Sequence, residues 1–347
     1  MALTLASLTD LAALRFDDII DVRAPSEFAE DHLPGAINLP VLDDGERARV
    51  GTVYKQVAPF AARKIGAALV ARNVARHLEG ALADRTGGWR PLLYCWRGGQ
   101  RSGAFATILG QIGWRVETIA GGYKAWRGLV LKQLETAPAR LTVLDGNTGT
   151  AKTELLHLLA ARGVQVIDLE GLANHRGSLF GARGAQPSQR MFEGRLAHLL
   201  AGLDPSRPAV VEAESAMVGN CRLPPALWKA LCAAPRIELE APLPERAAYL
   251  ARAYADVTAD PARLAATIDL LRPWHAAERI GEWQALAARG EFKDLAGQLV
   301  AAHYDPRYLK HRSRNDVPRQ VLRLETLGPD GLAPAADRLA AMIWSGR

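Results

Sequence analysis

Residues 91–103, PLLYCWRGGQRSG, decide the fold of the first part of the chain. Four residues with apolar character predict a short buried strand that runs straight into Cys95. A loop with Gly98 and Gly99 follows, and a helix is predicted to begin near Ser102. A cysteine in this position faces successive backbone N–H groups and the positive end of a helix. The pattern therefore predicts an anion-binding loop with Cys95 as its nucleophile.

The loop after Cys95 has the composition of an anion site. Its glycines let the backbone curl, and two arginines add positive charge that is expected to lower the pKa of the thiol. The residues expected to contact the anion are Trp96, Arg97, Gly98, Gly99, Gln100, Arg101 and Ser102. The plainer alternative is a buried structural cysteine at the end of a strand.

A second glycine-containing turn, GNTGTAKT at residues 146–153, follows an apolar run and precedes a helical pattern. This is the context of a phosphate-binding loop. Backbone N–H groups are expected to cradle a phosphate, Lys152 to reach its outer oxygens, and Thr153 to hold magnesium. The predicted phosphate ligands are Gly146, Asn147, Thr148, Gly149, Thr150, Ala151, Lys152 and Thr153. The alternative is a tight strand-to-helix turn without a ligand.

Ala151 replaces the glycine that usually precedes the lysine of such a loop. Alanine is expected to be tolerated if it keeps a negative φ. Carboxylates follow another apolar run, at Glu212 and Glu214, and carboxylate oxygens suit Mg²⁺ directly or through water. We expect at most one of them to be a ligand, because they share a face only if the strand continues through both. Solvent-facing glutamates are the alternative.

Short apolar runs alternate with helical patterns along the chain. In the first 135 residues the runs predict strands at 19–22, 91–94 and 116–119, with helices at 58–82, 101–112 and 123–134. The pattern pauses at 136–139, and further runs predict strands at 141–144, 164–167, 209–211 and 237–239. This alternation predicts an α/β fold with a mostly parallel sheet in each part.

The last third of the chain is rich in Ala and Leu at helical spacing. We therefore expect three parts: a first α/β domain at 12–135, a phosphate-loop domain at 139–245, and a helical C-terminal part at 246–347, which is a candidate region for contact with a polyanionic partner.

Composition places the chain among ordinary globular proteins, with 347 residues and 49% hydrophobic residues. The net charge of +6 suits a polyanionic partner such as nucleic acid. Three cysteines without metal-ligand spacing argue against a disulfide framework or a cysteine metal site. We expect a cytoplasmic protein with no membrane partner, because Asp10 interrupts the N-terminal apolar residues and no run approaches roughly 18 apolar residues.

Four motifs in order resemble the rhodanese family. They are DVR with EF at residues 21–28, HLPGAINLP at 32–40, the cysteine loop, and GGYKAW at 121–126. The resemblance implies a rhodanese-like fold for the first domain. Five residues lie between Cys95 and Arg101, and this longer loop resembles that of rhodanese-fold phosphatases. It is therefore expected to accept a phosphate-sized anion.

A rhodanese domain followed by a P-loop domain resembles the tRNA 2-selenouridine synthases. Three further stretches carry the resemblance: ERARVGTVYKQ at residues 46–56, CWRGGQRS at 95–102, and HYDPRY at 303–308. The match extends from about Asp18 to about Arg319. Ala151 and Ala213 depart from the family pattern, and these departures bear on nucleotide use.

The resemblance implies a two-step modification of 2-thiouridine at position 34 of a tRNA. The base is first S-geranylated from geranyl diphosphate, and selenium from selenophosphate then replaces the sulfur group. Cys95 is implied to carry selenium or to orient selenophosphate, and the Lys152 loop to bind the diphosphate. No tightly bound organic cofactor is implied.

The tRNA-binding surface is predicted less directly. Residues 303–323 carry six basic and two acidic residues, and Tyr304 and Tyr308 are candidate stacking faces. The candidate tRNA contacts are Tyr54, Lys55, Arg307, Lys310, Arg312 and Arg314. A solvated helix end is the alternative. Two other functions stay open: a sulfurtransferase or rhodanese-fold phosphatase fused to an NTPase, and a non-catalytic tRNA-binding protein.

Overall fold

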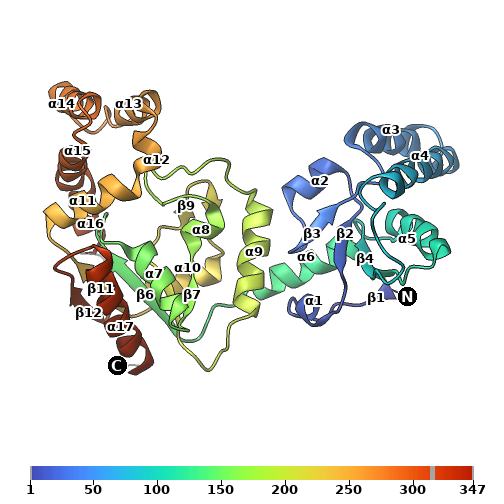
Figure 1. Ribbon diagram of the computed structural model, residues 1–347, viewed down its shortest axis with the longest axis horizontal. Helices are drawn as coiled ribbons and strands as arrows, with labels where there is room; N and C mark the ends of the chain where they lie inside the picture. The colour runs from blue at the N-terminus through green and yellow to red at the C-terminus, as the bar shows by residue number, and fades with distance from the viewer. Residues whose placement is uncertain (1, 313–316, 346–347) are drawn as a thin grey trace. The chain divides into compact units, whose positions relative to one another are not determined.

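The computed structural model describes residues 2–312 and 317–345. The chain forms two compact units (Figure 1). The first contains residues 1–136 together with 187–202, and the second contains residues 137–186 together with 203–347. Among the described residues, none of the helices combines the length and the apolar character that a membrane crossing needs.

The first unit is built on a parallel sheet with the strand order β1-β5-β4-β2-β3. Its strands are β1 (Ala2–Leu3), β2 (Asp18–Asp21), β3 (Ala36–Asn38), β4 (Pro91–Tyr94) and β5 (Glu117–Ile119). Its helices are α1 (Asp10–Ala13), α2 (Pro25–Glu30), α3 (Asp44–Gln56), α4 (Pro59–Glu79), α5 (Gln100–Ile112), α6 (Gly122–Gln133) and α9 (Gln189–Ala201). The predicted alternation of strands and helices is confirmed.

Strand β4 occupies the interior of this sheet, and all four of its residues are buried. Strands covered on both faces read as continuous apolar runs, which is why the sequence pattern located this strand. Leu93 and Cys95 join Phe105 and Leu109 of α5 in one apolar core. Cys95 therefore directly follows a strand whose residues are all buried.

Helix α9 differs from the expected division of the chain, because it follows the phosphate loop in sequence but belongs to the first unit. Its Gly194 packs so closely on Trp126 that an added Cβ would lie 2.8 Å from the indole. Glu193 pairs with Arg127 of α6, and Arg190 pairs with Glu30 at 2.9 Å. Helical periodicity alone does not tell which apolar core a helix joins.

The second unit contains another parallel sheet, with the order β12-β11-β6-β8-β7, and a two-stranded antiparallel ribbon, β10-β9. Its strands are β6 (Leu141–Gly146), β7 (Gln165–Ile167), β8 (Ala209–Glu212), β9 (Met217–Val218), β10 (Cys221–Arg222), β11 (Arg236–Glu240) and β12 (Arg319–Arg323). Its helices are α7 (Lys152–Ala161), α8 (Leu169–Ala173), α10 (Pro225–Ala233), α11 (Leu243–Ala253), α12 (Ala255–Thr258), α13 (Pro261–Asp269), α14 (Ala277–Ala288), α15 (Phe292–Leu299), the π-helical turn η1 (Val300–Tyr304), α16 (Asp305–Arg312) and α17 (Pro329–Ser345).

The predicted second parallel sheet with a largely helical C-terminal part is confirmed, but the sheet has a strand that was not predicted. Strand β12 pairs in parallel with β11 from Arg236 opposite Arg319 onward, and α17 packs into the same core as α7. Only Leu322 is fully buried in β12, so this edge strand lacks the apolar run that marks a central one. One edge strand of the sheet therefore comes from the part of the chain that was expected to be helical.

Strands β6 and β8 lie next to each other in register, so their carboxyl ends meet at one edge of the sheet. The loop after β6 contains Lys152, and β8 ends at Glu212. Open parallel sheets bind ligands at this edge, outside the carboxyl ends of the strands. The fold therefore brings the predicted phosphate loop and the predicted carboxylates together.

Candidate functional site

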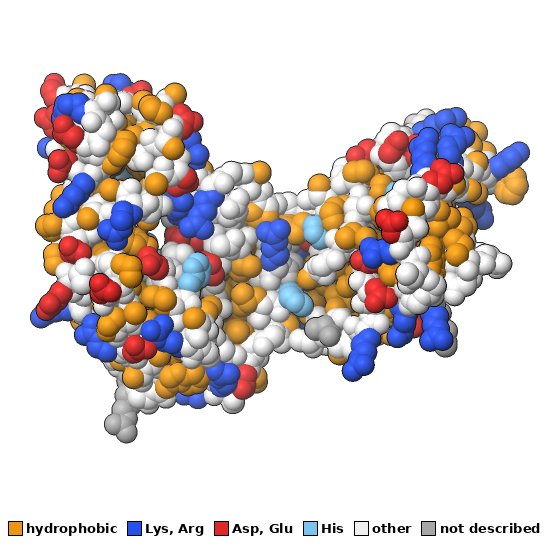
Figure 2. Space-filling model, in the orientation of Figure 1, with side chains coloured by type: hydrophobic (Ala, Val, Ile, Leu, Met, Phe, Trp, Pro, Cys, Tyr) orange, Lys and Arg blue, Asp and Glu red, His pale blue; other side chains and the backbone are white. Residues whose placement is uncertain are grey.

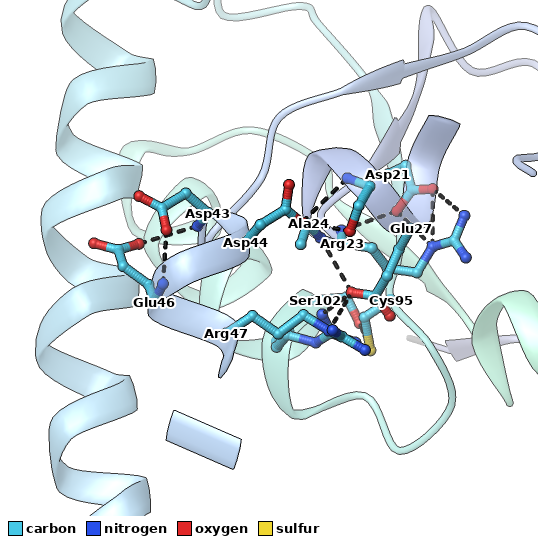
Figure 3. Close-up of polar contacts among 12 residues, drawn as sticks. Asp21, Arg23, Ala24, Glu27, Asp43, Asp44, Glu46, Arg47, Cys95 and Ser102 are labelled. Atoms are coloured by element: carbon cyan, nitrogen blue, oxygen red, sulfur yellow. Dashed lines mark hydrogen bonds and ion pairs between the residues drawn. The ribbon is translucent and has the colours of Figure 1, made fainter. Parts of the chain in front are cut away.

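Cys95 lies directly after β4, and 4% of the residue is exposed. The hydroxyl of Ser102, in the first turns of α5, donates a hydrogen bond of 3.4 Å to its sulfur. Ser102 is itself 1% exposed, so the two side chains face each other in a protected position (Figure 3).

The start of α6 closes against the backbone of the cysteine loop. The backbone N–H of Tyr123 donates to the carbonyl of Cys95 at 2.8 Å, and that of Lys124 donates to the carbonyl of Trp96 at 2.9 Å. Gly122 has φ +56°, and an added Cβ would lie 2.3 Å from the carbonyl oxygen of Cys95. The GGY motif therefore lets the start of α6 lie against the cysteine loop, because only glycine at position 122 allows this approach.

Arg101 points to a carboxylate in this structure, which differs from the expectation that it faces the anion. Its guanidinium lies 2.8 Å from Glu27, which also accepts from Arg47 at 3.0 Å (Figure 3). Burial disfavours ionised Glu27, but the hydrogen bond and charge of Arg101 outweigh it and lower the pKa. Trp96 and Arg97 are exposed on the loop, so Arg97 is the better placed cation for an incoming anion.

The phosphate loop connects β6 to α7 as predicted from sequence. The ammonium of Lys152 lies against the loop backbone, donating to the carbonyl of Gly146 at 2.7 Å and contacting that of Asn147 at 3.4 Å. The backbone N–H of Thr150 closes the turn on the carbonyl of Asn147 at 3.3 Å. The lysine therefore reaches the inside of the turn, where a phosphate is expected to bind.

Ala151 adopts φ +58° and ψ 30°, so the condition of a negative φ is not met. A residue with a Cβ in the left-handed region costs about 1–2 kcal/mol. The methyl group is 3% exposed and packs in the core beside Leu155 and Leu156, which offsets part of that cost. The loop thus keeps the conformation that glycine would adopt.

Two carboxylates meet at Thr153. Its hydroxyl donates to Glu170 at 2.9 Å and contacts Glu212 at 3.4 Å. The other oxygen of Glu212 accepts the backbone N–H of Glu170 at 2.8 Å. Sequence reasoning missed Glu170. Its position three residues after the apolar run 164–167 was a usable signal, but its closeness to Glu212 depends on the pairing of β7 with β8 in the sheet.

Burial keeps this acidic cluster from carrying its full charge. Burial and then the charge of Glu170 raise the pKa of Glu214 to about 8, and the same two causes raise the pKa of Glu212 well above its usual range. Burial also raises the pKa of Glu170. Strand β8 ends at Glu212, which is buried against Thr153 and Glu170, whereas Glu214 lies beyond the end of the strand and lines the cavity over the phosphate loop. Within residues 2–312 and 317–345, no group of three acidic, His or Cys side chains is arranged to hold a metal ion by itself.

Asp305 of the late HYDP motif holds the phosphate loop from the other side. It accepts from the side-chain amide of Asn147 at 2.9 Å and from both terminal nitrogens of Arg246, at 2.7 and 3.0 Å. The Nε of Arg246 donates to the carbonyl of Thr148 at 2.9 Å. Sequence reasoning placed this motif with the tRNA contacts and missed its role at the loop, because 158 residues separate Asn147 from Asp305.

A cavity of about 580 Å³ opens over the phosphate loop. The cationic side chains that line this cavity can neutralise the charge of a polyphosphate. They are Lys152, Arg176, Arg183, Arg236, Arg307 and Arg319. Tyr304 and Tyr308 also line it, and the Lys152 ammonium is 5.9 Å from the ring centroid of Tyr308. The structure thus places both tyrosines at this cavity, where sequence reasoning had offered them as stacking faces for RNA.

The predicted tRNA contacts are dispersed. Tyr54 and Lys55 are exposed on α3 in the first unit, whereas Arg307 lines the cavity of the second. Arg307 donates to His303 at 3.0 Å and stacks 4.8 Å from the ring centroid of Trp274. The side chains of Lys310 and Arg312, and all of Arg314, lie outside the described residues.

The fold and its two loops define a class of two-domain protein, in which a rhodanese-like domain with a protected cysteine is joined to a phosphate-loop domain. Residues 5–129 match the rhodanese-like domain family, and residues 139–323 match the AAA domain of tRNA 2-selenouridine synthase. The chain belongs to the tRNA 2-selenouridine synthase family of enzymes, which confirms the predicted family and enzyme class.

Relatives in this family span most of the chain. A tRNA 2-selenouridine synthase from Cupriavidus pinatubonensis is 36% identical over 88% of this chain and 91% of its own length. Those from Aeromonas salmonicida and Chromohalobacter salexigens are 42% and 40% identical, over 71% and 73% of this chain and 67% and 70% of their own lengths. Both domains are thus shared with the relatives.

Proposed function

We propose that this enzyme converts 2-thiouridine at position 34 of a tRNA into 2-selenouridine in two steps, each served by its own anion site. The observation that carries the proposal is that each unit has a glycine-containing strand-to-helix turn, and of these two turns only the first holds a thiol. The phosphate loop suits the departure of a diphosphate, and the cysteine loop suits the handling of selenium.

In the first step, the sulfur of the thiouridine attacks the carbon of geranyl diphosphate that bears the diphosphate. A sulfur–carbon bond forms while the carbon–oxygen bond breaks and diphosphate leaves. Lys152 and the backbone N–H groups of residues 146–153 hold the leaving group and neutralise its growing charge. The ring of positive side chains around the cavity adds to this stabilisation.

Magnesium fits this step as a companion of the diphosphate. Thr153 and one carboxylate, with Glu214 the better exposed to the cavity, offer the oxygen ligands that Mg²⁺ prefers alongside phosphate oxygens. When bound, the ion supplies charge neutralisation for the leaving diphosphate. The raised pKa of Glu214 means that its ligation releases a proton near neutral pH.

In the second step, the selenium of selenophosphate attacks the base carbon that bears the geranylthio group. A carbon–selenium bond forms while the carbon–sulfur bond breaks and geranylthiol leaves, and water then cleaves the selenium–phosphorus bond and releases phosphate. Cys95 orients selenophosphate in the loop, and the hydroxyl of Ser102 holds the sulfur of Cys95 through a hydrogen bond. Because Arg101 is held by Glu27, the loop N–H groups and Arg97 are proposed to contact the phosphate oxygens.

The two steps are separable by mutation. Cys95→Ala is expected to abolish selenation while sparing geranylation, because the thiol belongs only to the second step. Lys152→Ala is expected to cripple geranylation first. Purified variants incubated with 2-thiouridine tRNA, geranyl diphosphate and selenophosphate are analysed by mass spectrometry of the nucleosides. Normal selenouridine formation by Cys95→Ala would contradict the role of the cysteine, and the absence of both products from the unmodified enzyme would contradict the function.

The exposed end of α3 is the proposed tRNA contact in the first unit. Tyr54 is 56% exposed, and Val57 and Phe60 beyond it are 74% and 75% exposed. Figure 2 shows Lys and Arg side chains gathered over α3 and α4. Exposed aromatic rings among basic side chains suit an unpaired anticodon loop. Lys55→Glu is expected to weaken tRNA binding and to flatten its salt dependence in filter-binding titrations.

A further inference from the structure

A second, apolar cavity of about 70 Å³ adjoins the phosphate-loop cavity in the second unit. Its wall comes from α11, α12, α13, α15, η1 and the segment at residues 178–180, and is carbon except for a few hydroxyl groups. The principal apolar side chains are Phe180, Val257, Leu264, Phe292, Leu295 and Leu299. The two proposed steps, as described so far, give this apolar cavity no role.

The two cavities share part of their walls. Thr148 of the phosphate loop lines both, and so do Leu250, Tyr254 and Tyr304. Helix α11 packs directly on the loop at this point, because an added Cβ on Gly149 would lie 2.9 Å from the side chain of Leu250. A ligand held by the loop therefore has an apolar hole within reach of its other end.

We propose that this apolar cavity receives the far end of the hydrocarbon tail of a prenyl diphosphate whose diphosphate is bound by the phosphate loop. The inference rests on the proposed function, and it adds the part of the chain that recognises the tail. A nucleobase is a poorer occupant, because its ring nitrogens would be buried without enough hydrogen-bond partners. An apolar tail loses nothing there and leaves water.

The volume limits the length of the tail. A cavity of about 150 Å³ accommodates the six carbons of benzene, so 70 Å³ holds about three carbons, the branched tip of the terminal isoprene unit. A second isoprene unit is expected to lie along the shared wall of Leu250, Tyr254 and Tyr304 before the diphosphate begins. A ten-carbon tail thus fits this arrangement, and a fifteen-carbon tail exceeds it.

The experiment uses substitutions that fill the cavity with a larger side chain and leave its apolar wall intact. Ala296 on α15 lines it, and Ala296→Leu places a larger apolar side chain there while keeping good helix propensity. Ala251→Leu on α11 fills it from another helix and guards against a folding defect in the first variant. Ala285→Leu on α14 is the matched control, because Ala285 is exposed and lines neither cavity.

Binding of inorganic pyrophosphate, dimethylallyl diphosphate and geranyl diphosphate to the full-length chain is measured by calorimetry with magnesium. Each buried CH₂ contributes about a fourfold gain in affinity. The burial of about three carbons in the cavity should therefore make geranyl diphosphate bind the unmodified protein roughly a hundredfold more tightly than pyrophosphate. In the filling variants this advantage should fall about tenfold or more, with pyrophosphate and dimethylallyl diphosphate unaffected. The control should keep the full advantage.

The outcomes separate the inference from the function on which it rests. If pyrophosphate binds and the filling variants keep the full advantage for geranyl diphosphate, the tail lies elsewhere and the inference is overturned, while the proposed function stands. If the unmodified enzyme binds none of the three and makes no geranylated tRNA, the proposed function itself fails and the inference falls with it. Loss of the advantage in both filling variants, with pyrophosphate binding intact, supports the inference.

Discussion

Replacing Asp305 by Asn tests whether the late HYDP motif supports the phosphate loop. The substitution keeps the shape of the side chain and removes the charge that pairs with Arg246. The Arg246 side chain is 6% exposed, and that of Asp305 is 26% exposed. Breaking a fully buried pair costs about 3–5 kcal/mol. Because water reaches part of Asp305, we expect Asp305→Asn to lower the free energy of unfolding by about 2–3 kcal/mol.

The surface pair between Arg162 and Asp337 is the matched control. Its contact distance, 2.6 Å, is similar, but the Asp337 side chain is 68% exposed. Exposed pairs contribute about 0–1 kcal/mol, so Asp337→Asn should change stability by less than about 1 kcal/mol. Urea denaturation followed by circular dichroism measures both variants under the same conditions.

The phosphate loop supplies a second readout. Asn147 and Thr148 lose part of their anchoring in Asp305→Asn, so pyrophosphate affinity should fall about tenfold, or about 1.4 kcal/mol. Selenation of tRNA that is already geranylated should be unchanged, because Cys95 lies in the other unit. If Asp305→Asn is no more destabilising than Asp337→Asn and binds pyrophosphate normally, the anchoring role is wrong.

Three other substitutions test local features. Ala151→Gly should stay within about 1 kcal/mol of the parent in urea denaturation, because relief of the left-handed strain is offset by the lost methyl burial and a more flexible unfolded chain; a larger change would contradict this balance. Gly122→Ala should destabilise the first unit by about 3 kcal/mol and abolish selenation, since its Cβ would overlap the Cys95 carbonyl; normal nucleoside profiles would refute this. Burial, then the charge of Arg307, lowers the pKa of His303 from 6.5 to about 4. The unfolded chain therefore takes up a proton first, so stability falls as pH drops from 6.5 to 4, and His303→Gln should flatten that fall in urea titrations at pH 7 and 4.5.

The sequence predicted the central strands and both loops because their signals are local. Strand β4 is buried on both faces and therefore reads as an apolar run, and each loop is marked by glycines directly after such a run. The phosphate loop also needs its lysine and threonine at adjacent positions, which no other turn in the chain offers. Local chemistry of this kind is legible without knowing the fold.

Features that depend on the order of strands in the sheet could not be predicted from the sequence. Glu170 reaches Thr153 only because β7 lies beside β8, and Asp305 reaches Asn147 across 158 residues. Helix α9 carries an ordinary apolar face, and nothing in that face says which unit will bury it. The sign of φ at Ala151 could not be predicted for another reason: the loop geometry is fixed by its hydrogen bonds, and the residue type only decides how much strain it carries.

The two loops follow one physical plan, and that plan explains where the family motifs outside them lie. In each loop, the residue just before the helix is left-handed: Gly99 at φ +73° and Ala151 at φ +58°. Such a turn points backbone N–H groups toward one spot and makes an anion site without side chains. Side chains are then needed mainly to hold the turn. An arginine beside each loop is tied by a carboxylate from elsewhere in its own unit, Arg101 by Glu27 and Arg246 by Asp305. Arg47 of the ERARVGTVYKQ motif pairs with Glu27, and Asp305 of the HYDPRY motif pairs with Arg246. We therefore expect the loss of either contact to impair mainly the step whose loop that contact supports.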